Sequence, residues 1–184
     1  MGGVVLRAVT ESDVPFVLGL NARNVARLSP LDAGRLAQLR GWADRTDVVL
    51  FDGQPAGFVV TVGPGTDYDS ANYRWFVDRF GDSFYYLDRI VVDDPFRRSG
   101  IGRAVYDELE HHATPYSRMA LEVDVEPPNE ASLAFHRDRG YQPVGRLAGG
   151  GKAAALMVLE LADGPTDTPT GAPTGGAPTG RAPA

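Results

Sequence analysis

The sequence predicts a single α/β domain in which helices flank a mixed β-sheet. Residues 84–113 give the first indication, because an apolar strand, a basic glycine-containing turn and an amphipathic helix follow one another there. The order of the predicted elements gives the second: a strand, two helices, three strands, a helix, a strand, a helix and two strands. The chain has 184 residues, which is enough for one domain with a substantial core.

The first predicted elements are a strand at residues 4–9 and two helices. Thr10 is typical of a helix N-cap, and Asp13 occupies the capping-box position three residues later. A second helix is expected at residues 30–43, with Ser29 as its N-cap. Both helices carry apolar side chains at helical spacing, which predicts that each packs one face against the sheet.

A hairpin and a long connection come next. Residues 48–51 and 55–62 are typical of two strands joined by a tight turn around Asp52–Gly53. Residues 63–83 are too many for a plain hairpin loop and too aromatic for a flexible linker. Ser70 is expected to cap a short helix within this connection.

The central stretch changes its periodicity halfway. Residues 85–92 are rich in β-branched and aromatic side chains, which predicts a strand, and the Asp-Asp-Pro sequence that follows ends it. Val105, Leu109 and Ala113 then recur at helical spacing among charged residues. The sequence therefore predicts a strand, a turn and an amphipathic helix in succession.

The turn between this strand and this helix has the sequence RRSGIG at residues 97–102. Backbone N–H groups at a helix N-terminus favour anions, and glycine lets a bulky ligand approach the backbone. Arginine adds positive charge and forked donors that suit phosphate oxygens. These properties predict a phosphate or pyrophosphate site, although a solvated basic turn that only begins the helix has the same composition.

The C-terminal part repeats strand and helix signals. Residues 118–125 alternate apolar and acidic side chains, which predicts a strand. Asn129 is a good N-cap for a helix at residues 130–139. Two further strands are expected at residues 141–147 and 153–161.

Two low-complexity segments are predicted to carry no chemistry. The sequence GGGK at residues 149–152 lacks the phosphate-loop pattern, because Arg146 stands at the first glycine position and Ala153 replaces serine or threonine. A hairpin turn is the better interpretation. Residues 163–184 repeat Pro, Thr, Gly and Ala with almost nothing apolar to bury, which predicts a disordered tail after a domain at residues 1–162.

The composition excludes several classes of protein. A net charge of −6 argues against a general nucleic-acid surface. The absence of cysteine excludes a disulfide framework and a thiolate zinc site, and no metal is expected. There is no signal-peptide pattern and no apolar run of membrane-spanning length, so a cytoplasmic protein without a membrane partner is expected. A homodimer is left open.

Two blocks of the sequence resemble the GNAT N-acetyltransferase superfamily. Arg97-x-x-Gly100-x-Gly102 after a β-branched strand is similar to the family's acetyl-CoA signature, R/Q-x-x-G-x-G/A. Residues 128–136 and Gly140–Tyr141 are similar to its second block, N-x-x-A-x-x-F/L-Y…G-F/Y. The order and spacing of the two blocks fit the family. The resemblance implies a mostly antiparallel sheet whose central strands splay apart.

The resemblance also implies acetyl-CoA as a co-substrate. In the family, the pantetheine arm pairs with the backbone of the signature strand, and the pyrophosphate binds the turn after it. Asn129 stands where the family contacts the coenzyme arm, although an N-cap role alone also explains it. The implied coenzyme-binding residues are Ile90, Val91, Val92, Arg97, Arg98, Ser99, Gly100, Ile101, Gly102, Arg103 and Asn129.

Attack of an amine on an acetyl thioester requires a neutral amine, an oxyanion stabiliser and an acid for the thiolate. The oxyanion donor is expected to be a backbone N–H near Val91 or Val92. The family's usual acid is a tyrosine seven residues after the asparagine, where this chain has His136. His136 is either the acid or a structural helix residue, and a thiolate can also leave without help. Asp88 and Glu122 are candidates for the base, directly or through water, or else ordinary strand-face carboxylates.

Aromatic and asparagine side chains are the candidates for the acceptor side of the predicted site. Tyr68, Tyr73 and Trp75 are expected to form part of the acceptor wall, because aromatic rings offer an apolar body and hold a cation. The same rings could instead close the edge of the core. Asn21 and Asn24 could face the acceptor or simply be exposed helix residues.

The expected function is direct transfer of an acetyl group from acetyl-CoA to an amine in a ternary complex. The acceptor is expected to be a small-molecule or peptide amine, and nothing in the sequence selects among these. An alternative is a non-catalytic acyl-CoA-binding module. A dinucleotide-binding protein fits less well, because Val105 stands at the third glycine position of that fingerprint.

Overall fold

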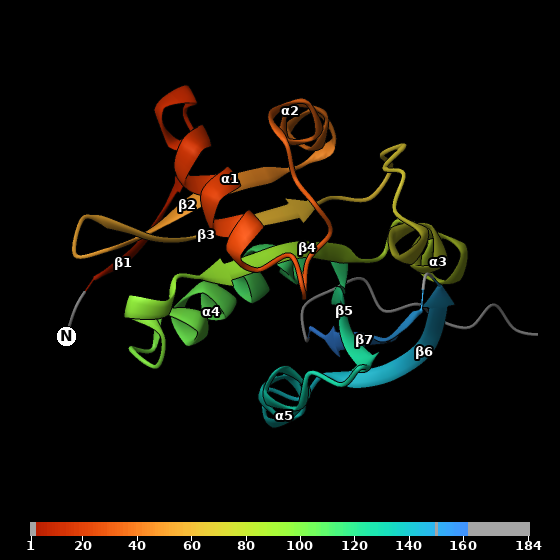
Figure 1. Cartoon of the computed structure of the whole chain (residues 1–184). Helices are drawn as coiled ribbons and strands as arrows, with labels where there is room; N and C mark the ends of the chain where they lie inside the picture. The colour runs from red at the N-terminus through yellow and green to blue at the C-terminus, as the bar shows by residue number, and fades with distance from the viewer. Residues whose placement is uncertain (1–2, 150, 162–184) are drawn as a thin grey trace, which may run out of the picture.

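The computed structural model describes residues 3–149 and 151–161 (Figure 1). The predicted tail at residues 163–184 lies outside these ranges, so its disorder stays a prediction. Five α-helices are described: α1 (Val14–Arg23), α2 (Ala33–Trp42), α3 (Ala71–Phe80), α4 (Ile101–Ala113) and α5 (Glu130–Asp138). None of the helices in these ranges is both long and apolar enough to cross a membrane.

Seven strands form one sheet in the order β1-β2-β3-β4-β5-β7-β6. Neighbouring strands are antiparallel except β4 and β5, which are parallel. The predicted mixed, mostly antiparallel α/β fold is therefore confirmed. The strands are β1 (Val4–Ala8), β2 (Arg45–Phe51), β3 (Gln54–Val62), β4 (Tyr85–Val92), β5 (Arg118–Glu126), β6 (Gln142–Gly149) and β7 (Lys152–Glu160).

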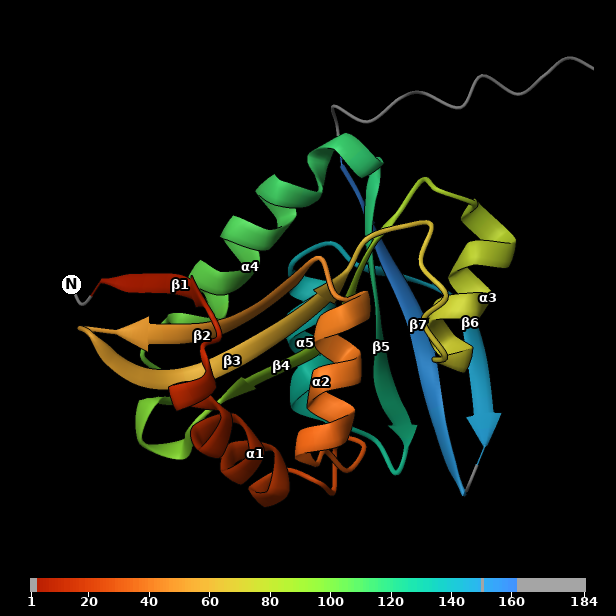
Figure 2. The ribbon, with the colours of Figure 1, turned by 90° about the horizontal axis from the view of Figure 1, so that it is seen from above.

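Helices cover both faces of the sheet (Figures 1 and 2). α1 and α2 lie on one face, and α4 and α5 lie on the other. The apolar stripe of α4, which includes Val105 and Leu109, is buried in a core against the sheet. A second core lies under α1 and α2, and a third joins α3 to the strands β5 and β7. Each core forms because an amphipathic helix must bury its apolar face.

Several local predictions are confirmed because short-range chemistry determines them. The Ser70 hydroxyl accepts a hydrogen bond from the backbone of Tyr73 and caps α3. The Asn129 side chain caps α5 in the same way. Asp52 and Gly53 have φ angles of 51° and 78°, the left-handed values of a two-residue hairpin turn between β2 and β3.

The start of the second helix was predicted wrongly. Asp32, not Ser29, is the N-cap of α2, which begins at Ala33. The backbone carbonyl of Ser29 instead accepts hydrogen bonds from Arg89 of β4, at 2.8 Å, and from Asn21 of α1, at 3.1 Å. These tertiary bonds hold the α1–α2 connection in a non-helical path, which the local sequence does not reveal.

The centre of the sheet splays open. β4 and β5 are paired only at Tyr85 with Met119 and at Tyr86 with Ala120. β4 continues to pair with β3 as far as Val92, while β5 continues beside β7. The two strands therefore diverge beyond this short parallel ladder, as the family resemblance implied, and leave an opening in the middle of the sheet.

Gly57 of β3 allows β4, the strand that borders this opening, to lie close to β3. An ideal Cβ at Gly57 would lie 2.3 Å from the carbonyl oxygen of Val91, far inside contact distance. Gly57→Ala is therefore expected to force β3 and β4 apart and to lower the free energy of unfolding by roughly 1–3 kcal/mol, measured by urea denaturation. Gly41→Ala on the exposed side of α2, where a Cβ meets nothing within 4 Å, is the control. Equal stability of the two variants would contradict the close approach.

Candidate active site

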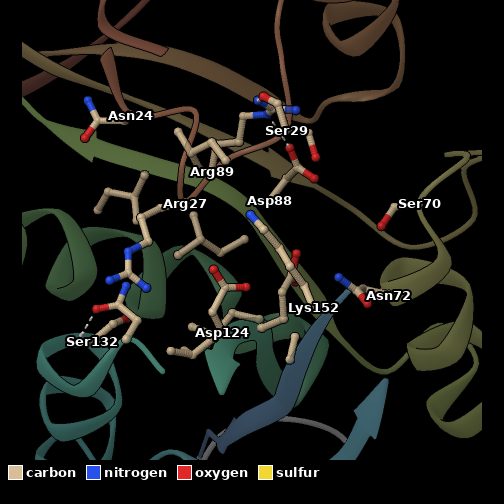
Figure 3. Close-up of a pocket in the computed structure, with 18 of the residues that line it drawn as sticks. Asn24, Arg27, Ser29, Ser70, Asn72, Asp88, Arg89, Asp124, Ser132 and Lys152 are labelled. Carbon is tan, nitrogen blue, oxygen red and sulfur yellow. Dashed lines mark hydrogen bonds and ion pairs between the residues drawn. The ribbon is translucent and has the colours of Figure 1, made fainter. Parts of the chain in front are cut away.

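A cavity of about 1050 Å³ occupies the opening between β4 and β5 (Figure 3). Its walls come from residues 87–92 of β4 and residues 121–124 of β5. The α1–α2 connection, the first residues of α3 and the β6–β7 hairpin close it on other sides. The splay thus brings segments from the whole chain around one concave site, which is the usual form of a ligand site.

Five of the eleven predicted coenzyme-binding residues line this cavity. Its lining includes Ile90, Val91, Val92, Arg97 and Asn129. Beyond the ladder with β5, the edge of β4 presents backbone N–H and C=O groups toward the opening rather than to a neighbouring strand. An extended ligand with amide groups can pair with such an edge.

The other six residues form the turn before α4 and the first residues of that helix. Gly100 is the N-cap, with a φ of 86° that favours glycine, and no described side chain caps the helix. The first N–H groups of α4 are thus left without a side-chain partner at the positive end of the helix dipole. Ile101 is buried in the core, so only its backbone can contact a ligand. Arg98 and Ser99 complete the turn, and Gly102 and Arg103 lie in the first turn of α4.

A β-bulge brings two adjacent charged side chains together. Val60 pairs with Arg89 and Thr61 pairs with Leu87, so Asp88 has no partner of its own in β3. Adjacent strand residues normally point to opposite faces, but a bulge redirects them. The Nε of Arg89 consequently lies 3.1 Å from a carboxylate oxygen of Asp88, and both side chains are buried (Figure 3).

Arg89 also ties the α1–α2 connection to the sheet. Its Nη1 donates to the Asn21 side chain at 2.9 Å and to the carbonyl of Ser29 at 2.8 Å. Asn21 is 0% exposed and does not line the cavity, whereas Asn24 does. Of the two asparagines considered from the sequence, the structure brings only Asn24 to the cavity.

The two candidate bases differ in their surroundings. Asp88 accepts a hydrogen bond from the Tyr68 hydroxyl at 2.5 Å as well as from Arg89, while burial raises its pKa above the ordinary value. Glu122 accepts from the Tyr86 hydroxyl at 2.6 Å and from the side chain of Asn72. Burial, and then the charge of Asp88, raise the pKa of Glu122 to about 7. A carboxylate that titrates near neutral pH is suited to accept a proton and release it again.

His136 lines the cavity but both of its ring nitrogens are engaged. Nδ1 lies 2.7 Å from the carbonyl oxygen of Ser132, which can only accept, so Nδ1 carries the proton. Nε2 lies 2.6 Å from the hydroxyl of Tyr106 and accepts a hydrogen bond from it. Burial lowers the pKa of His136, so this neutral tautomer prevails near pH 7. In this state Nε2 has no proton to donate.

The predicted aromatic wall is divided between the cavity and the core. Tyr68 lines the cavity, but Tyr73 and Trp75 do not. Tyr73 is 1% exposed and its hydroxyl donates to the carbonyl of Gly63 at 2.8 Å. Trp75 packs directly over Gly145 of β6, where a Cβ would lie 2.5 Å from the indole ring. These two rings fill the core under α3.

The structure adds cavity residues that the sequence analysis did not select, among them Asn72, Arg89, Tyr106 and Lys152, and it adds the buried Tyr86, which donates to Glu122 from behind the wall. Arg89 could have been noticed, because a charged pair within an apolar strand predicts a buried interaction. Lys152 could have been noticed as the only lysine of the chain. No local pattern distinguishes Asn72, Tyr86 or Tyr106. Within the described ranges, no group of three or more acidic or histidine side chains gathers in a form that could hold a metal ion.

Solved structures share this fold at low sequence identity. Ard1 from Thermoplasma volcanium is 16% identical, with a TM-score of 0.67 over 86% of this chain and 98% of that chain. The ribosomal-protein-S18-alanine N-acetyltransferase from Escherichia coli is 20% identical, with a TM-score of 0.61 over 87% and 95%. Arabidopsis thaliana NAA60 in complex with acetyl-CoA is 15% identical, with a TM-score of 0.66 over 86% and 100%.

No functionally curated protein matches this chain in sequence. The family model of the acetyltransferase (GNAT) family does match, over residues 21–141. That range covers the α1–α2 connection, the splayed strands, the turn before α4 and the whole of α5. Because the match spans more than half of the chain and the fold agrees with it, this protein belongs to the GNAT acetyltransferase family.

Proposed function

We propose that this protein transfers the acetyl group of acetyl-CoA directly to an amine acceptor within a ternary complex. The observation that carries the proposal is Glu122, a carboxylate with a pKa of about 7 on the wall of the opening between β4 and β5. A thioester held in this opening would lie beside a base that is half ionised under physiological conditions.

Acetyl-CoA would bind across the opening and the turn that follows it. The edge of β4 at Ile90, Val91 and Val92 would pair with the amides of the pantetheine arm. The pyrophosphate would lie at the uncapped N-terminus of α4, between the guanidinium groups of Arg97 and Arg103. The side chain of Asn129 already caps α5, so its remaining amide donors are the groups it could offer to the arm.

In the proposed reaction, Glu122 removes a proton from the acceptor ammonium. The neutral amine attacks the thioester carbonyl, and a backbone N–H near Val91 stabilises the oxyanion. The C–N bond forms and the C–S bond then breaks. The second proton, which the nitrogen must lose to become an amide, passes through solvent to the departing CoA thiolate. His136 has no role in this scheme as a donor, because its Nε2 is an acceptor. Asp88 contributes by raising the pKa of Glu122.

The coenzyme site can be tested with two variants of one glycine. Gly100→Asn and Gly100→Asp place nearly isosteric side chains at the same left-handed position, which asparagine tolerates best after glycine. We expect Gly100→Asp to weaken acetyl-CoA binding at least about tenfold more than Gly100→Asn, because only the carboxylate repels the phosphates. Isothermal titration calorimetry with acetyl-CoA and with CoA measures both. Equal affinities would mean that no phosphate lies at this turn.

Turnover then separates the proposal from a non-catalytic acyl-CoA-binding module. A free-thiol assay with a panel of amines is expected to show CoA release that depends on both the acceptor and Glu122. Tight acetyl-CoA binding without amine-dependent thiol release would favour the binding module instead.

A further inference from the structure

Lys152 places a positive charge at the mouth of the cavity. It is the only lysine among the chain's 18 lysine and arginine residues, and it begins β7 directly after the β6–β7 turn. Its side chain extends from β7 into the cavity, on the side where Asp88 lies (Figure 3). The Nζ atom lies 3.0 Å from the carbonyl oxygen of Ala26 in the α1–α2 connection.

The charge of Lys152 is not neutralised by the part of the protein that the structure describes. The ammonium group has three donors, and the carbonyl of Ala26, a neutral acceptor, takes one. Lys152 forms no ion pair with any carboxylate of residues 3–149 or 151–161. Three carboxylates of these residues line the cavity with Lys152: Asp88 accepts from Arg89, Glu122 accepts from Tyr86, and Asp124 of β5 lies on the same wall but forms no ion pair with Lys152.

Two other exposed cations of the described ranges line the cavity: Arg97, which pairs with Asp94 and belongs to the proposed coenzyme turn, and Arg27, which lies at the end opposite Lys152. Arg27 points from the α1–α2 connection toward Ser132 of α5, with its Nη1 3.4 Å from the carbonyl of Pro128 (Figure 3). That end adjoins Asn129, where the coenzyme arm is proposed to pass. Lys152 is therefore the cation that remains for the acceptor.

We propose that the acceptor carries a carboxylate close to its amine, and that Lys152 binds this carboxylate. The proposal rests on the proposed function for the amine end, where Glu122 would accept the proton. An ammonium group near Glu122 and a carboxylate at Lys152 would complement the charges of these two side chains. A free amino acid and a peptide with an acidic residue near its N-terminus share this chemistry.

A purely structural role for Lys152 makes a different prediction. If Lys152 only tethers the α1–α2 connection through Ala26, its loss would weaken every acceptor alike. A carboxylate-binding role acts only on acceptors that carry the negative charge. Matched acceptor pairs that differ in this one charge therefore distinguish the two roles.

The first test compares acceptor pairs in kinetics. One pair consists of tetrapeptide amides that begin with Glu or Gln, and the other of free alanine and alaninamide. In one pair or the other, the wild type is expected to show a kcat/KM about ten- to a hundredfold higher for the acidic member, the range of a charge-assisted hydrogen bond. The pair that shows the preference identifies the source of the carboxylate. Absence of preference in both pairs would overturn the proposal.

Variants of Lys152 complete the kinetic test. Lys152→Gln is expected to lower kcat/KM for the acidic member to that of the neutral one and to leave the neutral member unchanged. Lys152→Arg, the matched control, keeps the charge and is expected to keep most of the preference. If Lys152→Gln lowered kcat/KM equally for both members, Lys152 would be a structural tether and the proposal would be overturned. A higher KM for acetyl-CoA in this variant would overturn it as well, because Lys152 would then contact the coenzyme.

A second test reads binding without turnover. Because the chain has one lysine, reductive methylation with 13C-formaldehyde places a charged NMR probe at Lys152 and otherwise only at the N-terminal amine. In the CoA-saturated protein, the Glu peptide or alanine is expected to shift the Lys152 resonance, and its neutral counterpart is not. Such a shift without acetylation of any acceptor would reject the proposed function but keep the carboxylate site. Acetylation of the acceptors without an NMR shift or a kinetic preference specific to the acidic members would keep the proposed function and reject the carboxylate site.

Discussion

Replacement of Glu122 by glutamine is expected to lower kcat/KM for amine acceptors by roughly a hundredfold or more, the contribution of a positioned general base. Glutamine retains an oxygen that can accept from the Tyr86 hydroxyl, so that hydrogen bond survives while the proton acceptor is lost. Steady-state kinetics with acetyl-CoA and one amine measure the effect. Asp78→Asn, which removes an exposed carboxylate from α3, is the control and should retain full activity.

The pH profile gives a sharper readout of the same variant. Glu122 accepts a proton only when it is ionised, so kcat/KM of the wild type is expected to rise with pH through about 7 and then to level off. Glu122→Gln should lose this inflection. Comparison of the two proteins with the same acceptor cancels the titration of the amine itself. An unchanged inflection in the variant would assign the base to another group.

Glu122 also links stability to pH. Its pKa rises from an ordinary 4.5 to about 7 on folding, so between these values the folded protein binds a proton that the unfolded chain does not. The free energy of unfolding therefore falls as pH rises through this window, by up to about 3 kcal/mol. Glu122→Gln removes this loss. We therefore expect the melting temperature of the variant minus that of the wild type to be larger at pH 8 than at pH 4.5. An equal difference at the two pH values would contradict the raised pKa of Glu122.

Replacement of Arg89 by methionine is expected to lower the free energy of unfolding by about 3–5 kcal/mol, measured by urea denaturation at pH 7. The variant keeps the side-chain volume but leaves the buried carboxylate of Asp88 without its cation. It also removes donors to Asn21 and Ser29. By contrast, Arg23 pairs with Asp93 while 56% exposed, so Arg23→Met should cost at most about 1 kcal/mol.

A double-mutant cycle separates these two contributions of Arg89. Asp88→Asn removes the buried charge, and the asparagine oxygen can still accept from Tyr68. In the double variant with Arg89→Met, we expect part of the lost stability to return, because no unpaired charge remains. The part that does not return measures the bonds to Asn21 and Ser29. A strictly additive double variant would show that the two charges do not interact.

Features that depend on neighbours in sequence could be predicted from sequence. The cap of α3 at Ser70, the cap of α5 at Asn129 and the turn at Asp52–Gly53 follow from side-chain and backbone chemistry within a few residues. The strand, turn and helix around Gly100 follow from a change of periodicity and from glycine's conformational freedom. Glu122 could be selected as a candidate base, because a carboxylate on a strand beside the signature strand faces the same opening.

Features that depend on distant segments were decided by the tertiary structure. The bulge at Asp88 turns two adjacent side chains toward each other, and Arg89 then prevents Ser29 from capping α2. The titration of Glu122 near pH 7 results from exclusion of water by packed strands, and the tautomer of His136 results from its two partners. Burial and long-range hydrogen bonds arise only when separate parts of the chain meet. The sequence by itself therefore determined the family, most elements and the glycine turn before α4, whereas packing determined which polar groups share one cavity and which of them can hold a proton.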